Sequence, residues 1–254
     1  MRQPGRPRVL RASLALPSLD LRACLFDVFG TVVDWRTSVA REFAAIAKAK
    51  GITGVDPVEF AVEWRKLYHP SMEEVRSGRR PFVILDVLHR ESLMKLVARY
   101  ALQNLSEADI DHLNRAWHRL DPWPDAVAAL ARLKRKFIIA PCSNGNIALM
   151  VDMAKRAGLP WDCILGAEIA RAYKPTPETY LASCRALALA PANVLMVAAH
   201  NPDLKAAKAA GLATAFVARP REHGQGQTSD LEPDRSSADI AAKNFTDLAA
   251  QLGA

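Results

Sequence analysis

The second half of the chain alternates between short apolar runs and longer amphipathic segments, and this alternation narrows the choice of folds more than any other feature. Short apolar runs predict buried strands, and segments with a helical apolar period predict helices. Strands that alternate with helices are typical of a doubly wound parallel α/β sheet. The predicted strands cover residues 137–141, 163–165, 194–198 and 214–217, and the predicted helices cover residues 125–134, 147–157, 177–188 and 202–210.

An earlier apolar run, residues 23–26, predicts one more strand of the same sheet, buried on both faces. Asp27 follows it directly, and open α/β sheets place their ligand chemistry at the carboxyl ends of their strands. Gly30 allows the backbone to turn and to approach a ligand closely, and Thr31 offers a hydroxyl that can hold the Asp27 carboxylate in one rotamer. An Asp close to a Gly more commonly caps a turn, so this stretch alone leaves both interpretations open.

A long helical pattern separates this strand from the second half of the chain. Helices are predicted over residues 39–50, from Asp56-Pro57 onward, over residues 82–102 and from Ser106 onward, with a break or kink at His69-Pro70. This block predicts a helical cap inserted over the strand ends of a Rossmann-like core. The predicted parts are an N-terminal extension over residues 1–19, expected to be disordered, a core over residues 20–35 and 121–254, and a cap over residues 36–120. Within the core, residues 219–237 predict a loop before a last helix near Asp247.

Charge and cysteine usage exclude several classes of partner. The net charge of +7 is not concentrated in a basic run with interleaved aromatic residues, so we expect no nucleic-acid partner. No apolar run is long enough for a membrane span or a secretory signal, so we expect no membrane partner. The four cysteines are far apart, with neither disulfide nor zinc spacing, and favour a cytoplasmic protein. A homodimer is the candidate assembly.

Four loops are predicted to leave the carboxyl ends of successive strands, and each carries a reactive group. Asp27 comes first, and Ser143 and Asn144 follow the next strand with a hydroxyl, an amide and loop N–H donors. Lys174 precedes a proline in an extended turn. Asp203 lies in the first turn of a predicted helix, where the helix dipole stabilises a carboxylate.

The order and spacing of Asp27, Ser143, Lys174 and Asp203 resemble the four motifs of the haloacid dehalogenase superfamily, from about residue 21 onward. Phosphatases of that superfamily resemble D-x-D-x-T, in which the second Asp protonates the leaving group and helps to hold magnesium. Phe29 stands at that position here and can do neither. The last motif also keeps only one carboxylate, so the site is a poor magnesium cage, and we expect no metal or other cofactor.

Displacement of a halide needs neither the lost acid nor the metal, because the halide leaves as an anion and a carboxylate can attack carbon to form an ester. The sequence D-V-F-G-T at residues 27–31, with S-N-G at 143–145, Lys174-Pro175 and Tyr180, resembles L-2-haloacid dehalogenases. The resemblance implies hydrolysis of small 2-haloalkanoic acids, such as haloacetates and L-2-halopropionate, to 2-hydroxy acids through an aspartyl ester. The alternatives are a magnesium-dependent phosphatase of the same superfamily and a catalytically silent interaction protein of this fold.

The resemblance also implies a role for each motif residue. Asp27 corresponds to the nucleophile and Thr31 to its orienting neighbour. Arg65, in the predicted cap, matches the family arginine that receives the halide, and a fixed guanidinium suits charge that develops on a leaving anion. The implied substrate contacts are Val28, Phe29, Arg65, Ser143 and Asn144, and the implied catalytic residues are Asp27, Thr31, Arg65, Ser143, Lys174, Tyr180, His200 and Asp203.

Three of these residues support others in the implied mechanism. Lys174 holds Asp27 and Asp203, Tyr180 supports the site, and Asp203 orients or activates the water that hydrolyses the ester. Each has a plainer interpretation: Arg65 as a solvated helix arginine, Lys174 as an exposed loop lysine and Tyr180 as an ordinary core aromatic. The aromatic residues Trp35, Trp64 and Tyr68 are expected to pack the cap rather than to touch substrate.

The last motif departs from the family pattern. Many such dehalogenases resemble S-S-N-x-aromatic-D, whereas residues 198–203 read A-A-H-N-P-D. We favour His200 as a neutral hydrogen-bonding replacement for Asn over a second base beside Asp203. Asn201 is predicted to cap the following helix, with Pro202 as its first residue. Because Pro202 replaces an aromatic wall of the halide pocket, we expect a smaller pocket suited to haloacetates.

Overall fold

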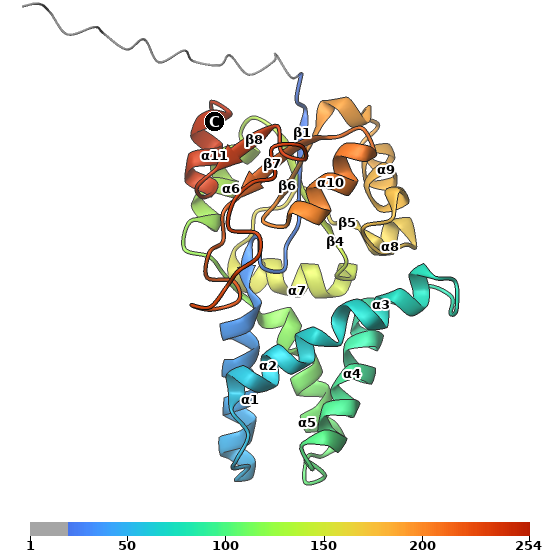
Figure 1. Ribbon diagram of the computed structural model, residues 1–254, viewed down its shortest axis with the longest axis vertical. Coiled ribbons are helices and arrows are strands. Elements are labelled where there is room, and N and C mark those ends of the chain that lie inside the picture. The colour runs from blue at the N-terminus through green and yellow to red at the C-terminus, as the bar shows by residue number, and fades with distance from the viewer. Residues whose placement is uncertain (1–19) are drawn as a thin grey trace, which may run out of the picture.

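The computed structural model describes residues 20–254, so the predicted N-terminal extension lies outside the described residues. Its core is a six-stranded parallel sheet with helices on both faces, and a group of helices extends from one end of that core (Figure 1). The doubly wound α/β fold predicted from the sequence is confirmed. The strands, in spatial order, are β5 (Leu165–Gly166), β4 (Ile138–Ser143), β1 (Ala23–Phe26), β6 (Val194–Ala198), β7 (Ala213–Val217) and β8 (Ile240–Ala242).

Strand β1 lies at the point where the strand order reverses. It pairs with β4 on one side and with β6 on the other, so that Cys24 faces Ile139 and Leu195 across the two ladders. The backbone N–H of Asp27 continues the second ladder by donating to the Val197 carbonyl at 2.9 Å. Loops diverge from a sheet at such a switch point and leave a crevice between them. Asp27 therefore lies at the edge of this crevice.

The alternation of side chains along β1 anchors the helices on the two faces of the sheet. Ala23 and Leu25 pack in one apolar cluster, and Cys24 and Phe26 pack in the other, all of them fully buried. Burying a side chain the size of Leu or Phe contributes about 2 kcal/mol. The first cluster includes side chains of α9 (Pro177–Ala186) and α10 (Asn201–Ala209), and the second includes side chains of α6 (Ala126–Lys134), α7 (Ile147–Ala157) and α11 (Phe245–Gln251).

Residues 35–119, which lie between β1 and β4 in the chain, form a helical block. Its elements are α1 (Trp35–Lys50), α2 (Pro57–Lys66), α3 (Tyr68–Arg76), α4 (Leu85–Arg99), α5 (Glu107–Asn114) and the 3₁₀ helix η1 (Arg115–Arg119). Local sequence sets their ends. Gly51 closes α1 with φ of 65°, the Asp56 side chain caps α2, and Ser106 with Asp109 forms a capping box on α5. The break predicted at His69-Pro70 lies at Leu67 instead, which places Pro70 in the first turn of α3, where a missing N–H costs little.

A two-residue antiparallel ladder joins the chain segments that enter and leave this helical block. Strand β2 (Val33–Asp34) pairs with β3 (Asp121–Pro122), with Val33 opposite Pro122. The Trp123 N–H extends the contact by donating to the Val32 carbonyl at 2.9 Å. The two crossings between core and helical block therefore lie side by side. Both strands are too short to show in the sequence.

Two local predictions need correction. The strand predicted to stop at residue 141 continues to Ser143, so Ser143 ends β4 instead of standing in the loop. The prediction that Asn201 caps the next helix is wrong, because His200 occupies the cap position and Asn201 is the first residue of α10. The Asn201 amide is engaged elsewhere: it donates to the Glu232 carbonyl at 3.0 Å and accepts from the Asp234 N–H at 2.8 Å.

Three further features complete the core. Strand β8 follows the predicted loop and was not expected from the sequence. Short helical turns connect the strands at α8 (Ala167–Ala170) and η2 (Pro191–Asn193).

Over residues 20–254, no helix combines the length and the apolar character that crossing a membrane requires.

Candidate active site

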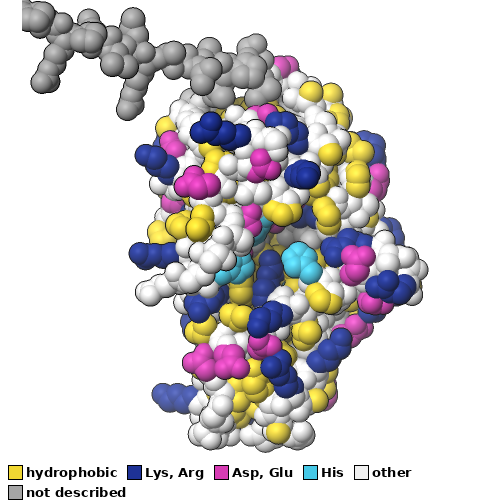
Figure 2. All heavy atoms as spheres, in the orientation of Figure 1, with side chains coloured by type: hydrophobic (Ala, Val, Ile, Leu, Met, Phe, Trp, Pro, Cys, Tyr) yellow, Lys and Arg dark blue, Asp and Glu magenta, His cyan; other side chains and the backbone are white. Residues whose placement is uncertain are grey.

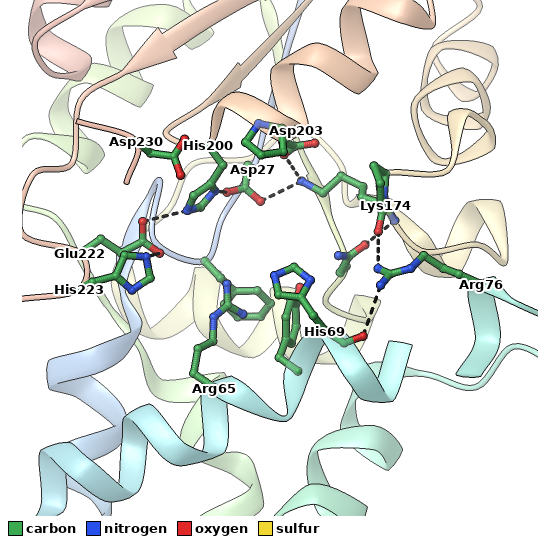
Figure 3. Close-up of a pocket in the computed structure, with 15 residues that line it drawn as sticks. Asp27, Arg65, His69, Arg76, Lys174, His200, Asp203, Glu222, His223 and Asp230 are labelled. Atoms are coloured by element: carbon green, nitrogen blue, oxygen red, sulfur yellow. Dashed lines mark hydrogen bonds and ion pairs between the residues drawn. The ribbon is translucent and has the colours of Figure 1, made fainter. Parts of the chain in front are cut away.

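A cavity of about 420 Å³ lies between the carboxyl ends of the core strands and helices α2 and α3. Figure 2 shows it as a hollow in which histidine side chains gather, and Figure 3 shows its lining. The core contributes Asp27, Phe29, Asn144, Lys174, Pro175, His200, Pro202, Asp203, Glu222, His223 and Asp230, and the helical block contributes Arg65, Tyr68, His69 and Arg76.

The Asp27 carboxylate is held at both oxygens. Its Oδ1 accepts from Lys174 Nζ at 2.8 Å, and its Oδ2 accepts from the Thr31 hydroxyl at 2.7 Å. The ring nitrogen Nδ1 of His200 lies 3.1 Å from the same Oδ2. Burial alone would raise the pKa of Asp27, but the charge of Lys174 and the hydrogen bond from His200 lower it well below its usual range. Asp27 is therefore ionised, as a carboxylate nucleophile must be.

Lys174 connects two carboxylates. Its ammonium group forms ion pairs with Asp27 and with Asp203, and the Tyr180 hydroxyl donates to the other oxygen of Asp203. Burial would lower the pKa of Lys174, but the charges of Asp203 and Asp27 raise it above its ordinary value, so the lysine is a permanent cation. The backbone also fixes this residue, because the Lys174 N–H donates to the side-chain oxygen of Asn144 at 2.8 Å.

His200 lies between two carboxylates as well. Its Nδ1 faces Asp27, and its Nε2 lies 2.8 Å from Glu222 Oε2. Burial would lower the pKa of His200, but the charge of Glu222 and the hydrogen bond to Asp27 raise it well above 6.5. This arrangement disfavours the predicted neutral replacement for Asn, because neither ring nitrogen faces a donor. The alternative of a second base is not supported either, since a protonated imidazole has no lone pair to offer.

Arg65 projects from α2 across the cavity toward Asp27 (Figure 3). Its guanidinium carbon lies 4.0 Å from the ring centre of Tyr68, 5.4 Å from that of Trp35 and 5.9 Å from that of Phe29. Its Nη1 is buried and has no hydrogen-bond partner within residues 20–254. A guanidinium held by aromatic faces, with unused donors, is suited to receive an anion.

The structure brings together most residues that the sequence singled out. Asp27, Thr31, Lys174, Tyr180, His200 and Asp203 form one hydrogen-bonded network, and Phe29, Arg65 and Asn144 line the same cavity. Val28 and Ser143 are fully buried and do not line it. The Ser143 hydroxyl instead accepts from the Gly145 N–H at 3.0 Å and so fixes the loop that carries Asn144. Tyr68, which we expected only to pack the cap, reaches the cavity.

Five lining residues were missed by the sequence analysis. Glu222, His223 and Asp230 come from the loop after β7, and His69 and Arg76 come from α3. Burial and the charges of Arg65 and Arg76 lower the pKa of His69 to about 4, so its ring is neutral at pH 7. The Gly- and Ser-rich loop carries no local signal for a site, because Glu222 acquires its partners only when the chain folds.

The fold and this network together define a class of protein. A family model described as haloacid dehalogenase-like hydrolase matches residues 21–211, and the chain belongs to this family. Within it, the chain is similar to L-2-haloacid dehalogenases. It is 52% identical to the defluorinating L-2-haloacid dehalogenase Rha0230, whose crystal structure matches with a TM-score of 0.89 and covers 92% of this chain and 96% of that chain. The L-2-haloacid dehalogenase PA0810 is 48% identical, with a TM-score of 0.88 over 92% of this chain and 99% of that chain.

Curated relatives agree with the structural neighbours. (S)-2-haloacid dehalogenase 1 from Pseudomonas sp. (strain CBS-3) is 32% identical over 213 residues, which is 80% of this chain and 88% of the relative. (S)-2-haloacid dehalogenase 4A from Burkholderia cepacia is 28% identical over 243 residues, which is 91% of this chain and 99% of the relative.

Proposed function

We propose that this protein is a hydrolase that removes halide from small L-2-haloalkanoic acids; its relatives are named as (S)-2-haloacid and L-2-haloacid dehalogenases. The observation that carries the proposal is the opposition of two groups across one cavity. An ionised Asp27 carboxylate lies on the core side, and Arg65, a cation with unused donors, lies on the cap side. When a carboxylate displaces a halide, the reaction needs both an ionised nucleophile and a cation that receives the leaving halide.

In the first step, one oxygen of Asp27 attacks the carbon that bears the halogen. The new C–O bond forms as the C–X bond breaks, both electrons of that bond leave with the halide, and no proton moves. Attack from the side opposite the leaving group inverts the carbon, so an L-2-haloacid gives a D-2-hydroxy acid. Arg65 stabilises the charge that develops on the halide, and the aromatic rings of Tyr68 and Phe29 keep water from that charge.

In the second step, water attacks the ester carbon Cγ of Asp27. Asp203 takes the proton of the water as its oxygen bonds to Cγ, and the carbonyl electron pair moves onto the remaining oxygen of Asp27. When this adduct collapses, the bond from Cγ to the alkylated oxygen breaks, and that oxygen leaves as the hydroxyl of the product after taking the proton from Asp203. Asp27 is left with the oxygen and the second proton of the water, and it releases that proton to solvent to regenerate the carboxylate. Lys174 supports both carboxylates, which it pairs in the resting state.

The cavity bears on which acids are accepted. A volume of about 420 Å³ lies in the usual range of ligand sites and exceeds what a two-carbon acid needs. The expectation of a preference for haloacetates therefore remains a prediction. A substrate panel should include fluoroacetate, because one similar protein is described as defluorinating. A clear preference for long-chain 2-haloacids would contradict the expectation.

The decisive test measures halide release from chloroacetate and 2-chloropropionate in excess chelator, with an Asp27→Asn variant beside it. Release that survives chelation and disappears in the variant supports nucleophilic dehalogenation. Phosphate release from a phosphate ester with magnesium, and no halide release, would favour a phosphatase. Inactivity in both assays by a folded protein would favour an interaction protein.

The proposal includes a cytoplasmic location and a homodimer as the candidate assembly. All four cysteines are free, and Cys24, Cys142 and Cys184 are buried, which suits a reducing compartment. Light scattering at assay concentration distinguishes a dimer from a monomer, and fractionation of the source cells locates the protein.

A further inference from the structure

Glu222 is a buried carboxylate that the mechanism above does not use. It lies in the loop after β7, where it is 1% exposed although its chain neighbours Arg221 and His223 are exposed. A carboxylate removed from water costs several kcal/mol unless charges and hydrogen bonds compensate. The loop therefore has a specific reason to direct this side chain inward.

Three contacts fix the Glu222 carboxylate. Its Oε2 lies 2.8 Å from His200 Nε2, and its Oε1 accepts from Trp35 Nε1 at 3.0 Å. The third contact is with Gly30, whose φ is +88°: a Cβ built there would lie 2.0 Å from Glu222 Oε1. Because Gly30, three residues after Asp27, has no side chain, the Glu222 carboxylate can occupy that space.

The proton count on His200 follows from this geometry. A neutral imidazole has one N–H, so one of its two nitrogens would direct a lone pair at a carboxylate. Both nitrogens lie within hydrogen-bond distance of carboxylate oxygens, at 3.1 Å from Asp27 and 2.8 Å from Glu222. Only an imidazolium donates to both. The pKa of Glu222 is lowered, since the nearby charge of His200 outweighs the effect of burial, so the carboxyl does not supply the proton instead.

We propose that Glu222 is a positioning residue that holds His200 as a doubly protonated imidazolium, and that this imidazolium and the Thr31 hydroxyl form the oxyanion site of ester hydrolysis at Asp27 Oδ2. The second donor is already oriented. Thr31 Oγ1 accepts from the Ala199 N–H at 2.9 Å, so its own proton is directed to Asp27 Oδ2. The inference rests on the proposed function, because it assigns a role in the second step of that reaction.

In this step Oδ2 is the oxygen that is not alkylated. It is a carbonyl oxygen in the ester and carries a full negative charge in the tetrahedral adduct. A cationic donor that is in place before the reaction stabilises that charge without reorganisation. Glu222 acts through His200, since its carboxylate contacts the imidazole and not Asp27.

Several other charged or titratable groups line the same cavity as the Glu222–His200 pair. They come from the core strands' loops, from α10 and from the helical block: Asp27, Lys174, Asp203, His223, Asp230, Arg65 and His69. The test must therefore change Glu222 without changing these groups.

The test compares Glu222→Gln with Glu232→Gln, an exposed residue of the same loop whose side chain lies outside the cavity. The first readout is NMR titration of ring-labelled histidine without substrate. In the wild type, His200 should remain doubly protonated well above the ordinary histidine pKa of about 6.5. In Glu222→Gln it should titrate at a lower pH, whereas Glu232→Gln should match the wild type. A neutral His200 in the wild type at pH 7 would overturn the proposal.

The second readout is the pH profile of kcat for halide release under excess haloacid. Glu222→Gln should lower kcat by about 10- to 100-fold with little change in KM, and its activity should decline at a lower pH than in the wild type. Single-turnover assays of Glu222→Gln should show that the Asp27 ester accumulates more than in the wild type. In a His200→Asn background, Glu222→Gln should have little further effect on kcat. An equal loss in both backgrounds would show a structural role and contradict the inference.

The two readouts separate the inference from the proposed function. If the wild type releases no halide from any haloacid, the proposed function fails, while the substrate-free titration still decides the protonation of His200. If the wild type releases halide and Glu222→Gln behaves like Glu232→Gln, the function stands and the role of Glu222 is wrong.

Discussion

The two walls of the cavity treat positive charge differently. On the core wall, Lys174 and His200 each lie between two carboxylates. On the cap wall, Arg65 lies among aromatic rings, with no ion pair to any described residue. The core cations are neutralised in place and hold the nucleophile. On the cap wall Arg76 is paired with Glu73, whereas Arg65 keeps its attraction for an incoming or leaving anion. Positive charge thus positions the nucleophile on the core wall, and on the cap wall it receives an anion.

The largest expected effect comes from removing the negative charge of Asp27 on the core wall. Asp27→Asn should lower halide release by at least about 10⁴-fold, because an amide is a poor nucleophile toward carbon. Glu232→Gln is the control, because it removes a carboxylate charge from an exposed residue outside the cavity. Halide release should be near the wild-type rate in the control. Comparable losses in both variants would mean that the loss is not specific to Asp27 and would contradict its assignment as the nucleophile.

The second effect tests the cap cation. Arg65→Gln should lower kcat for halide release by about 10²- to 10³-fold, since the charge that meets the developing halide is lost. Arg65→Lys keeps the charge but loses the planar stacking on Tyr68, and should fall between Gln and the wild type. Pre-steady-state measurement of ester formation locates the loss in the first step. If the Lys and Gln variants are equally impaired, stacking and not charge is what Arg65 contributes.

A third, smaller effect concerns the junction between the walls. His118 of η1 lies 3.0 Å from Asp86 of α4 and 2.8 Å from Asp152 of α7, so it links cap to core. Burial would lower the pKa of His118, but the hydrogen bonds and charges of Asp86 and Asp152 raise it. A raised folded-state pKa means that the stabilisation is complete below the unfolded value of about 6.5 and is lost as the pH rises through the folded value.

The measurement is denaturant unfolding of His118→Gln at two pH values. The variant should lose about 1 kcal/mol more of the free energy of unfolding at pH 5.5 than at pH 9. A loss that is the same at both pH values would show that His118 contributes by packing alone.

The smallest effect belongs to the cap far from the cavity. Ser106→Ala removes the hydroxyl half of the capping box on α5 and should lower the free energy of unfolding by about 1 kcal/mol. Halide release at 25 °C should not change, because α5 supplies no lining residue. A large loss of activity would mean that the far end of the cap also controls the site.

Sequence and structure agree where a signal is local. The helix at residues 147–157 and the strand at residues 194–198 have the predicted ends, because a continuous apolar period defines them. Asp27, Lys174 and Asp203 could be placed together because parallel strands bring their carboxyl ends to one edge. Features that depend on contacts between distant segments could not be predicted.

His200 and Glu222 illustrate that limit. The protonation of His200 depends on a carboxylate 22 positions later, and no local pattern joins the two residues. Asn201 has the composition of a helix cap, but its amide binds the backbone of the loop near residues 232–234 instead. In both cases a loop returns to α10 and supplies a partner that changes the expected role.

The ladder between β2 and β3 makes the helical block an insertion whose two ends meet. Because Val33 lies directly opposite Pro122, a short turn could join the chain there without moving any strand of the parallel sheet. Exchanging residues 35–120 for the corresponding segment of a relative would then add little chain-closure entropy, since the ends are already adjacent. The block can therefore be treated as a cassette, with the nucleophile kept in the recipient core and the anion receptor chosen with the donor.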